Sequence, residues 1–448
     1  MKPFSTNDEE GAFFALQKHD RVHAICLRST STTLEKLFAA MDGRFSILEE
    51  LILIVDMDVD DESDDESDDE RDDEHDDGCL GLPRTFEAPH LRHLELSRVG
   101  YVFEEGLPLL SSLSRLISLE LTGIPVSHYL PIECFASRLS SMPCLQYLNL
   151  GFDLYDPNED AGRLLDRVPD VERISLLHLN DIIFQGDSCY LEGLAARISA
   201  PHLTTFNALL LREPSPTTLP YLSKFLYAAE ELRRCAASIR FSSGTSMDRV
   251  ALCMACTEMR LDKYSEYAPF QMIFRCNSLN MQVTRTGQIC ATLAPMFSGV
   301  KRLRLDFEGD RPNPLGEEDD IERSRWHDLL RPFRNVLKLQ VDSRLMEDLS
   351  LALDPDDDGP SAEEILPELC KLARPHYGRF GNTFDGFIAA RRGVGRDIIK
   401  CRRPPIPRYK SGNEGEEEEE EEEKKEEEEE EEDNEDTSTE LDSDVDFK

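Results

Sequence analysis

Apolar residues recur along this chain in one fixed spacing: an apolar position, two residues, a second apolar position, one residue and a third. The segment APHLRHLELSRVG shows the spacing with Leu91, Leu94 and Leu96. Side chains alternate between the two faces of a β-strand, so Leu94 and Leu96 share one face while His93 and Glu95 occupy the other. One short strand cannot bury that apolar face alone, and burial of each leucine contributes roughly 1.5–3 kcal/mol. The pattern therefore predicts that several such strands pack together.

The same spacing returns along most of the chain, and its first positions are 25 to 32 residues apart where the copies are clearest. Such intervals are typical of leucine-rich repeats, whose period is ~20–29 residues. The clear copies are Val22/Ile25/Leu27, Leu48/Leu51/Leu53, Leu116/Leu119/Leu121, Leu145/Leu148/Leu150, Val171/Ile174/Leu176, Val300/Leu303/Leu305 and Val336/Leu339/Val341. The weaker copies are Leu203/Phe206/Ala208, Ala236/Ile239/Phe241 and Cys276/Leu279/Met281.

Between the strands lie segments 107–116, 132–142 and 219–232, whose apolar residues follow the three- and four-residue spacing of helices. Strand and helix thus alternate, which predicts an α/β fold. We expect a leucine-rich-repeat solenoid, or horseshoe, with parallel strands on its concave face and helices outside. A doubly wound sheet is the alternative, but it favours longer apolar strands and a glycine-rich first turn.

Charge is distributed very unevenly. Residues 58–77 carry a net charge of −14 and residues 411–448 a net charge of −20, out of −41 for the chain. Blocks of like charge with few apolar residues are typical of disordered segments. We therefore predict a short polar N-terminus over 1–18 and a repeat domain over 19–403. A disordered acidic insertion at 56–78 and an acidic loop at 309–320 interrupt that domain, and a disordered glutamate-rich tail follows it over 404–448.

In a horseshoe of this kind, the residues beside the second apolar position face the concave surface. These residues are acidic in the early repeats and basic in the late ones, so the surface is expected to change sign. A late basic strip of that kind would receive an acidic partner or the chain's own glutamate tail, or would simply be solvated. The candidate partner surface consists of Glu50, His93, Glu95, Ser118, Glu120, Tyr147, Asn149, Arg173, Arg302, Arg304 and Lys338.

No motif predicts catalysis, a cofactor or a metal. Cys253 and Cys256 form a single CxxC pair without the second pair that a structural zinc site needs. His90 and His202 occupy equivalent positions ahead of their strands and are interpreted as turn residues. The basic run 391–410 is a candidate nuclear import signal or nucleic-acid patch, but the adjacent glutamates would compete with phosphate, so no direct nucleic-acid partner is expected.

The compartment is expected to be the cytoplasm or the nucleus. The first residues, MKPFSTNDEEGAFF, lack the pattern of a secretory leader. No apolar run reaches ~18 residues, so no membrane span is predicted. The 12 cysteines are accordingly interpreted as reduced and mostly buried thiols.

Several segments together resemble the leucine-rich part of F-box proteins from mushroom-type fungi. They are KHDRVHAICLRS, APHLRHLEL, MPCLQYLNL, CNSLNMQVTRTGQICATLAPMFSGVKRLRLDF, and the terminal LPELCKL with FDGFIAARRGVGR. The resemblance covers about residues 19–403 without the acidic insertion. It implies a substrate-recognition module of a cullin-type ubiquitin ligase, although residues 1–20 hold no recognisable F-box, so no adaptor-binding residues are transferred.

The sequence thus favours a non-catalytic protein–protein interaction module with a protein partner on its concave face. A ubiquitin-ligase adaptor would be a further partner if an F-box had been lost by truncation. The alternative resembles the acidic leucine-rich nuclear proteins, which bind histones or other basic partners through a glutamate-rich tail. Here that tail would be the run of glutamates between 416 and 432.

Overall fold

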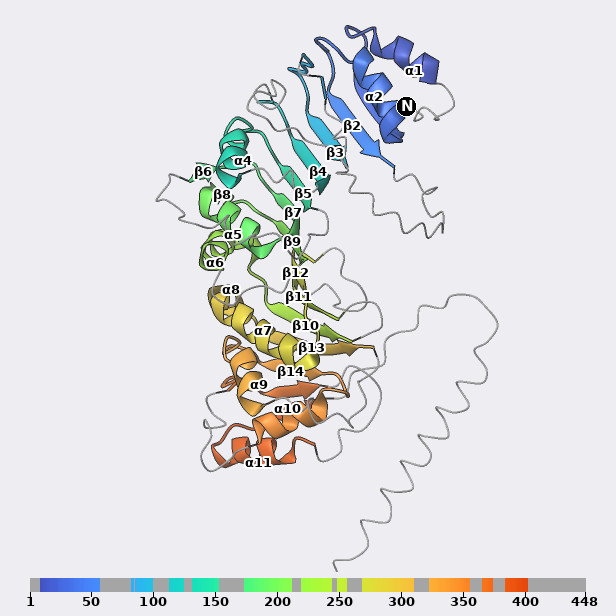
Figure 1. Cartoon of the computed structure of the whole chain (residues 1–448). Helices are drawn as coiled ribbons and strands as arrows, with labels where there is room; N and C mark the ends of the chain where they lie inside the picture. The colour runs from blue at the N-terminus through green and yellow to red at the C-terminus, as the bar shows by residue number, and fades with distance from the viewer. Residues whose placement is uncertain are drawn as a thin grey trace, which may run out of the picture. The chain divides into compact units, whose positions relative to one another are not determined.

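The computed structural model describes most of the chain between residues 9 and 401 (Figure 1). All described residues belong to one compact unit, Met1–Arg403. The expected acidic insertion, the acidic loop beyond residue 309 and the glutamate-rich tail lie outside the described residues. The described ranges are 9–56, 82–83, 85–99, 113–124, 131–152, 173–211, 219–243, 248–255, 268–309, 322–354, 365–373 and 383–401.

The fold is mixed α/β and is built on one large, mostly parallel sheet of 14 strands. The strand order is β1-β2-β3-β4-β5-β7-β9-β12-β11-β10-β13-β14-β15-β16, so neighbours in the chain are mostly neighbours in the sheet. The strands are β1 (Ala24–Ser29), β2 (Glu50–Val55), β3 (His93–Ser97), β4 (Ser118–Ile124), β5 (Tyr147–Phe152), β7 (Asp181–Gly186), β9 (Thr205–Leu210), β10 (Ala236–Ser242), β11 (Arg249–Ala255), β12 (Phe270–Arg275), β13 (Arg302–Glu308), β14 (Lys338–Val341), β15 (Lys371–Ala373) and β16 (Ile399–Cys401).

The repeated apolar trio forms the core of this sheet. In β3, Leu94 and Leu96 are buried, and Leu91 is buried in the turn before the strand. Leu94 pairs with Leu119 on β4, which in turn pairs with Leu148 on β5. Identical spacing in successive repeats therefore produces continuous rows of buried leucines, each row running from strand to strand across the sheet.

Helices connect most strands and bury their apolar stripes next to one another; Figure 1 shows α4 to α11 following one another along one side of the sheet. In-chain neighbours such as α4 and α5, α5 and α6, and α9 and α10 pack together, and α7 packs on α9. The helices are α1 (Glu9–Leu16), α2 (Ser31–Ala40), α4 (Ile132–Leu139), α5 (Ser188–Arg197), α6 (Pro220–Ala228), α7 (Leu279–Thr292), α8 (Ala294–Phe297), α9 (Arg323–Leu330), α10 (Met346–Leu353), α11 (Asp385–Gly393) and the 3-10 turn η4 (Glu230–Leu232).

Many of the predicted elements are present. The two helical segments expected at 132–142 and 219–232 are α4 and α6, and the closing strand, helix and strand of the C-terminal part are β15, α11 and β16. Of the helix expected at 107–116, only residues 113–116 are described, and they form a turn. The N-terminal segment, expected to be merely polar, contains α1, which packs on α2 and buries Leu16.

One predicted repeat is out of register with the structure. The strand expected around Ile174 is the short β6 (Ile174–Ser175), which pairs with β8 (Ile198–Ser199) in a separate two-stranded sheet. The place in the large sheet belongs to β7, where Ile182 and Phe184 are buried. Leu179, Ile182 and Phe184 have the same apolar spacing eight residues later in the chain, and Leu179 is fully buried. Two successive segments therefore match one pattern, and only the second forms a strand of the large sheet.

The region after β9 departs furthest from the expected repeat. The strand predicted from Cys276, Leu279 and Met281 is wrong, because Ser278 caps a helix there: its hydroxyl accepts from the Met281 N–H at 3.3 Å, and α7 follows. Two strands that the repeat pattern missed, β11 and β12, form an antiparallel meander with β10. This meander fills the space between β9 and β10, and β12 completes the sheet by pairing in parallel with β9.

A buried carboxyl group joins two successive helices. The N–H groups in the first turn of a helix have no partners within that helix, and in α6, which begins with proline, those of Tyr221 and Leu222 need other acceptors. Glu192 on α5 accepts from the N–H of Tyr221 at 2.6 Å and from the N–H of Leu222 at 2.8 Å. Burial raises the pKa of the Glu192 carboxyl to about 7, although the two N–H groups and Lys224 counteract part of that rise.

We predict that Leu148→Asp abolishes cooperative folding of the repeat region. Leu148 is fully buried, and a carboxylate there has no partner, which costs several kcal/mol on the scale of buried polar groups. Circular dichroism during thermal melting should show an early, broad transition. The control is Lys371→Asp, which places the same group at an exposed position of β15, on the face opposite the buried leucines, and should melt close to the wild type. Equal melting of both variants would contradict the assigned strand register.

We predict that Glu192→Gln reduces the pH dependence of stability. Because the folded-state pKa is raised, the contribution of Glu192 is fully present below its ordinary pKa and is lost as the pH rises towards 7. Between pH 4.5 and 8 the wild type should therefore lose on the order of 2–3 kcal/mol relative to the variant. Urea unfolding at a series of pH values measures this difference. Parallel curves for the two proteins would show that the carboxyl is not raised in pKa.

Candidate interaction surface

The large sheet has one face that its leucine rows do not use, here called the open face. In each strand the buried residues alternate with residues that are half-buried or exposed, and the latter lie in register from strand to strand. Ten of the eleven predicted partner-surface residues are on this face: Glu50, His93, Glu95, Ser118, Glu120, Tyr147, Asn149, Arg302, Arg304 and Lys338. Their role in binding stays a prediction.

The eleventh residue does not share this face. Arg173 is exposed and precedes β6, which belongs to the small sheet rather than the large one. The position expected for it in the large sheet is taken by Asp181 on β7, which pairs with Tyr147 of β5 and with Thr205 of β9. Asp181 was not predicted as a surface residue, because the strand was expected at the earlier of two matches to the apolar spacing.

Glu50, Glu95 and Glu120, on the neighbouring strands β2, β3 and β4, form what we call the acidic patch. Glu95 and Glu120 are direct partners in the register of β3 and β4. Burial raises the pKa of the Glu95 carboxyl, and the charges of Glu120 and Glu50 raise it further. Glu120 accepts from the side-chain amide of Asn149 at 3.3 Å. Burial, with Glu120 and Asp181 beside it, also raises the pKa of Tyr147 to about 12. The patch is therefore strongly unfavourable to further negative charge.

The opposite end of the open face carries what we call the basic row, Arg302, Lys338 and Lys371. Arg302 pairs in register with Lys338, and Lys338 pairs with Lys371. Among the described residues, none of these three cations takes part in an ion pair. Like charges on directly opposed strand positions destabilise a sheet. Lys371 was missed from the sequence because β15 is only three residues long, although the final strand itself was expected there.

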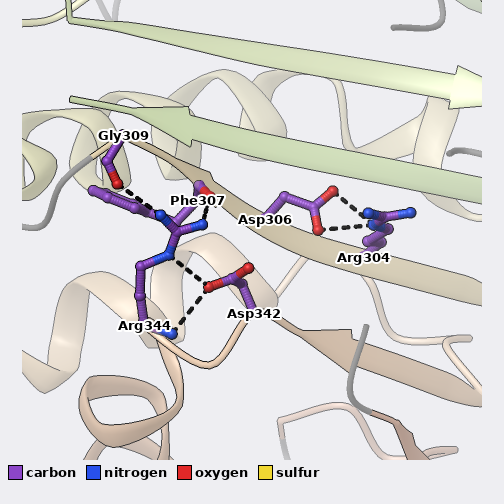
Figure 2. A network of polar contacts seen from close by, with 6 residues as sticks. All are labelled: Arg304, Asp306, Phe307, Gly309, Asp342 and Arg344. Carbon is purple, nitrogen blue, oxygen red and sulfur yellow. Dashed lines mark hydrogen bonds and ion pairs between the residues drawn. The ribbon is translucent and has the colours of Figure 1, made fainter. Parts of the chain in front are cut away.

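Next to the basic row, the charges are neutralised within the protein, as Figure 2 shows. Arg304 forms an ion pair with Asp306 at 2.6 Å, and both side chains are largely buried. Asp342 accepts from the side-chain and backbone N–H groups of Arg344, both at 3.0 Å. The Arg344 guanidinium also donates to the carbonyl oxygens of Phe307 and Gly309 at the end of β13. These contacts tie the end of β13 to the residues that follow β14.

The middle of the open face is partly apolar. Leu209 on β9 and Ile273 on β12 are direct partners in register, and both are half-buried. Ile183 on β7 lies one strand away and is also half-buried. These residues are on the open face and do not belong to the leucine rows. The repeat spacing gives no signal for them, because it specifies only the positions that face the core.

The described cysteines and histidines lie on strands, helices and turns along the repeats. In the described part of the chain, no group of three or more His, Cys, Asp or Glu side chains could hold a metal ion. Cys253 lies on β11, where burial raises the pKa of its thiol to about 11, and its neighbour in the CxxC pair is outside the described residues. His90 lies 3.0 Å from Arg115, and His202 is an exposed turn residue.

The ten described cysteines are all free, but only Cys276 and Cys290 are buried, so the expectation of mostly buried thiols is wrong. Several lie on the open face or the turns, where the repeat pattern leaves side chains half-exposed. None of the described helices is both long enough and apolar enough to cross a membrane.

Comparison with known proteins adds little. No protein-family model matches this chain, and no curated protein matches it. One solved structure with some likeness is the leucine-rich repeat-containing protein LegL7 from Legionella pneumophila, at 10% sequence identity and a TM-score of 0.28, covering 86% of this chain and 96% of that chain. A likeness at that level carries no argument about function.

We predict that Arg344→Ala destabilises the C-terminal strands by about 2–4 kcal/mol. The substitution leaves the buried Asp342 carboxylate without its main countercharge, and a buried charge without a partner is costly even though the Arg344 side chain itself is 40% exposed. The control is Arg331→Ala, which removes an exposed pair with Asp328 and should cost less than about 1 kcal/mol. Urea midpoints of the two variants test this. A similar loss for both would mean that the network in Figure 2 contributes no more than a surface ion pair.

Proposed function

We propose that this chain is a non-catalytic protein–protein interaction module, a leucine-rich-repeat solenoid that binds a protein partner on its open face. The observation that carries the proposal is that the 14 strands align their non-core positions in register, acidic at one end and basic at the other. Such a surface costs stability through neighbouring like charges on adjacent strands, which a binding partner of opposite charge would relieve.

We further propose a relation to the substrate-recognition part of fungal F-box proteins. The quoted segments that support it correspond to β1, β3, β5, α7 with β13, and β15 with α11. In this reading the open face selects the substrate, and a ubiquitin-ligase adaptor would be bound elsewhere. The compartment proposed for such a protein is the cytoplasm or the nucleus.

The alternative, a protein that binds histones or other basic partners through its glutamate-rich tail, predicts a different dependence. Binding would then follow residues 411–448, whose net charge is −20, and would not depend on the open face. The two functions are separable, because each assigns the partner to a different part of the chain.

The test is affinity purification from the native organism with the full-length chain, an open-face variant and a matched control. The open-face variant combines Glu120→Lys with Arg302→Glu, and the control combines Glu35→Lys with Lys36→Glu, two exposed residues on α2. We expect the main partners to be lost from the open-face variant, by roughly ten-fold or more, and retained by the control.

Recovery of a cullin adaptor together with open-face-dependent partners would support the F-box relation. Partners that survive the open-face changes but disappear when residues 411–448 are deleted would favour the acidic-tail alternative and contradict the proposed module. The same purification therefore decides between the two.

A further inference from the structure

The acidic patch and the basic row occupy mirrored places in the strand order. With 14 strands, the midpoint of the sheet falls between β9 and β12. Counted outwards from that midpoint, β4 and β13 take equivalent places on the two sides, as do β3 and β14, and β2 and β15. In each of these strand pairs, one strand carries an open-face glutamate and the other an open-face cation: Glu120 and Arg302, Glu95 and Lys338, and Glu50 and Lys371.

We propose that the open face binds a second copy of this chain, with the acidic patch of each copy against the basic row of the other. This inference rests on the proposed function and names a partner for the same surface. A twofold axis parallel to the strands, placed at the midpoint of the sheet, turns the two open faces towards each other and reverses the strand order. It is an isologous arrangement, in which each contact occurs twice.

The rotation also keeps positions along the strands aligned. An axis parallel to the strands leaves their direction unchanged, so residues at the start of one strand meet residues at the start of its counterpart. Glu50 and Lys371 belong to the same register row, which runs through the first residues of β2, β3, β4, β13, β14 and β15. Glu50 is therefore level with Lys371. Glu95 and Glu120 lie two residues, roughly 7 Å, further along the strands than Lys338 and Arg302, an offset that long side chains can span. Arg304 is level with Glu120 but is already paired with Asp306.

The apolar centre fits the same axis. Leu209 on β9 and Ile273 on β12 flank the midpoint as direct partners in register. The rotation places Leu209 of one copy opposite Ile273 of the other, twice. Protein interfaces commonly bury an apolar centre and surround it with polar and charged contacts. The open face has that composition, with charges of opposite sign at its two ends.

Among the described residues, the acidic patch and the basic row do not neutralise each other within one copy. From β4 to β13 there are seven strand-to-strand steps, so the acidic patch and the basic row are separated by roughly 33 Å along the sheet. The screening length at physiological ionic strength is about 8 Å, so the two ends do not stabilise each other. Like charges remain adjacent at each end, and a second copy offers both ends their complement at once.

The experiment is a charge exchange in the full-length chain. One variant carries Glu50→Lys, Glu95→Lys and Glu120→Lys, and the other carries Arg302→Glu, Lys338→Glu and Lys371→Glu. Sedimentation velocity at about 0.15 M salt measures association. We expect the wild type to dimerise and each variant alone to do so with a dissociation constant raised roughly ten-fold or more. An equimolar mixture of the two variants should form a heterodimer, because every contact regains opposite charges.

The control exchanges three cations away from the open face, Lys18→Glu, Arg21→Glu and Lys36→Glu, all of which are exposed. It should dimerise like the wild type, which separates the local contacts from the change in net charge of −6 that it shares with the basic-row variant. If a reversed variant melts earlier than the wild type, the corresponding glutamine substitutions at the same three positions replace it. The glutamine set removes the attraction without placing like charges together, and should weaken dimerisation in the same direction.

A wild-type chain that stays monomeric at about 100 µM, where even a weak complex would associate, would overturn the proposal. So would dimers that persist in both variants, or variants that do not recover association on mixing. The proposed function would still hold after any of these results, provided that the open-face variant loses its partners in the affinity purification. If the wild type does not self-associate and its partners are also retained by the open-face variant, both proposals would be wrong.

Discussion

The structure depends on one constraint, the alternation of side chains along a strand. A strand with apolar residues at every second position must bury that face, and the adjacent copy of the same pattern is what buries it. The leucine rows, such as the row through Leu94, Leu119 and Leu148, therefore continue from strand to strand. The same alternation determines which side chains lie on the open face, because every strand residue that is not on the buried face is on the opposite one.

That constraint separates stability from recognition. Substitutions on the leucine rows act on the packing between neighbouring repeats, whereas open-face residues such as Glu95 and Lys338 contribute little apolar contact. Charged pairs have to be neutralised where they are buried, and Arg304 with Asp306 and Arg344 with Asp342 provide this in the C-terminal half. Charges that remain exposed on the face are free to differ from strand to strand, which is where specificity can be encoded.

Much of the fold could be predicted from the sequence, because the apolar spacing reports directly on the buried face. The strands carrying Leu94, Leu119, Leu148 and Leu303 are in the sheet as expected. The spacing failed where it occurs twice in close succession, in a match that ends at Leu176 and another that begins at Leu179, since only packing decides between two equal matches. Strands β11 and β12 could not be found, because their partners are antiparallel or distant in the chain. Of the candidate surface, Arg173 was misplaced for the first reason, and Asp181 was missed with it.

The meander of β10, β11 and β12 also affects how the chain reaches its native state. Up to β9, nearly every strand pairs with one formed shortly before it, so structure can spread outwards from any early pair. This sequential addition stops at β9, because its next partner in the sheet is β12. Phe206 of β9 pairs with Phe270 of β12, and the described elements between them in the chain are α6, η4, β10 and β11. Closing such a long loop is slow compared with adding the next repeat. The other edge of the meander, where Ala236 of β10 pairs with Arg302 of β13, closes a loop of similar length. The two edges therefore separate the meander from the repeats on either side, and their closure is the step expected to limit the rate of folding.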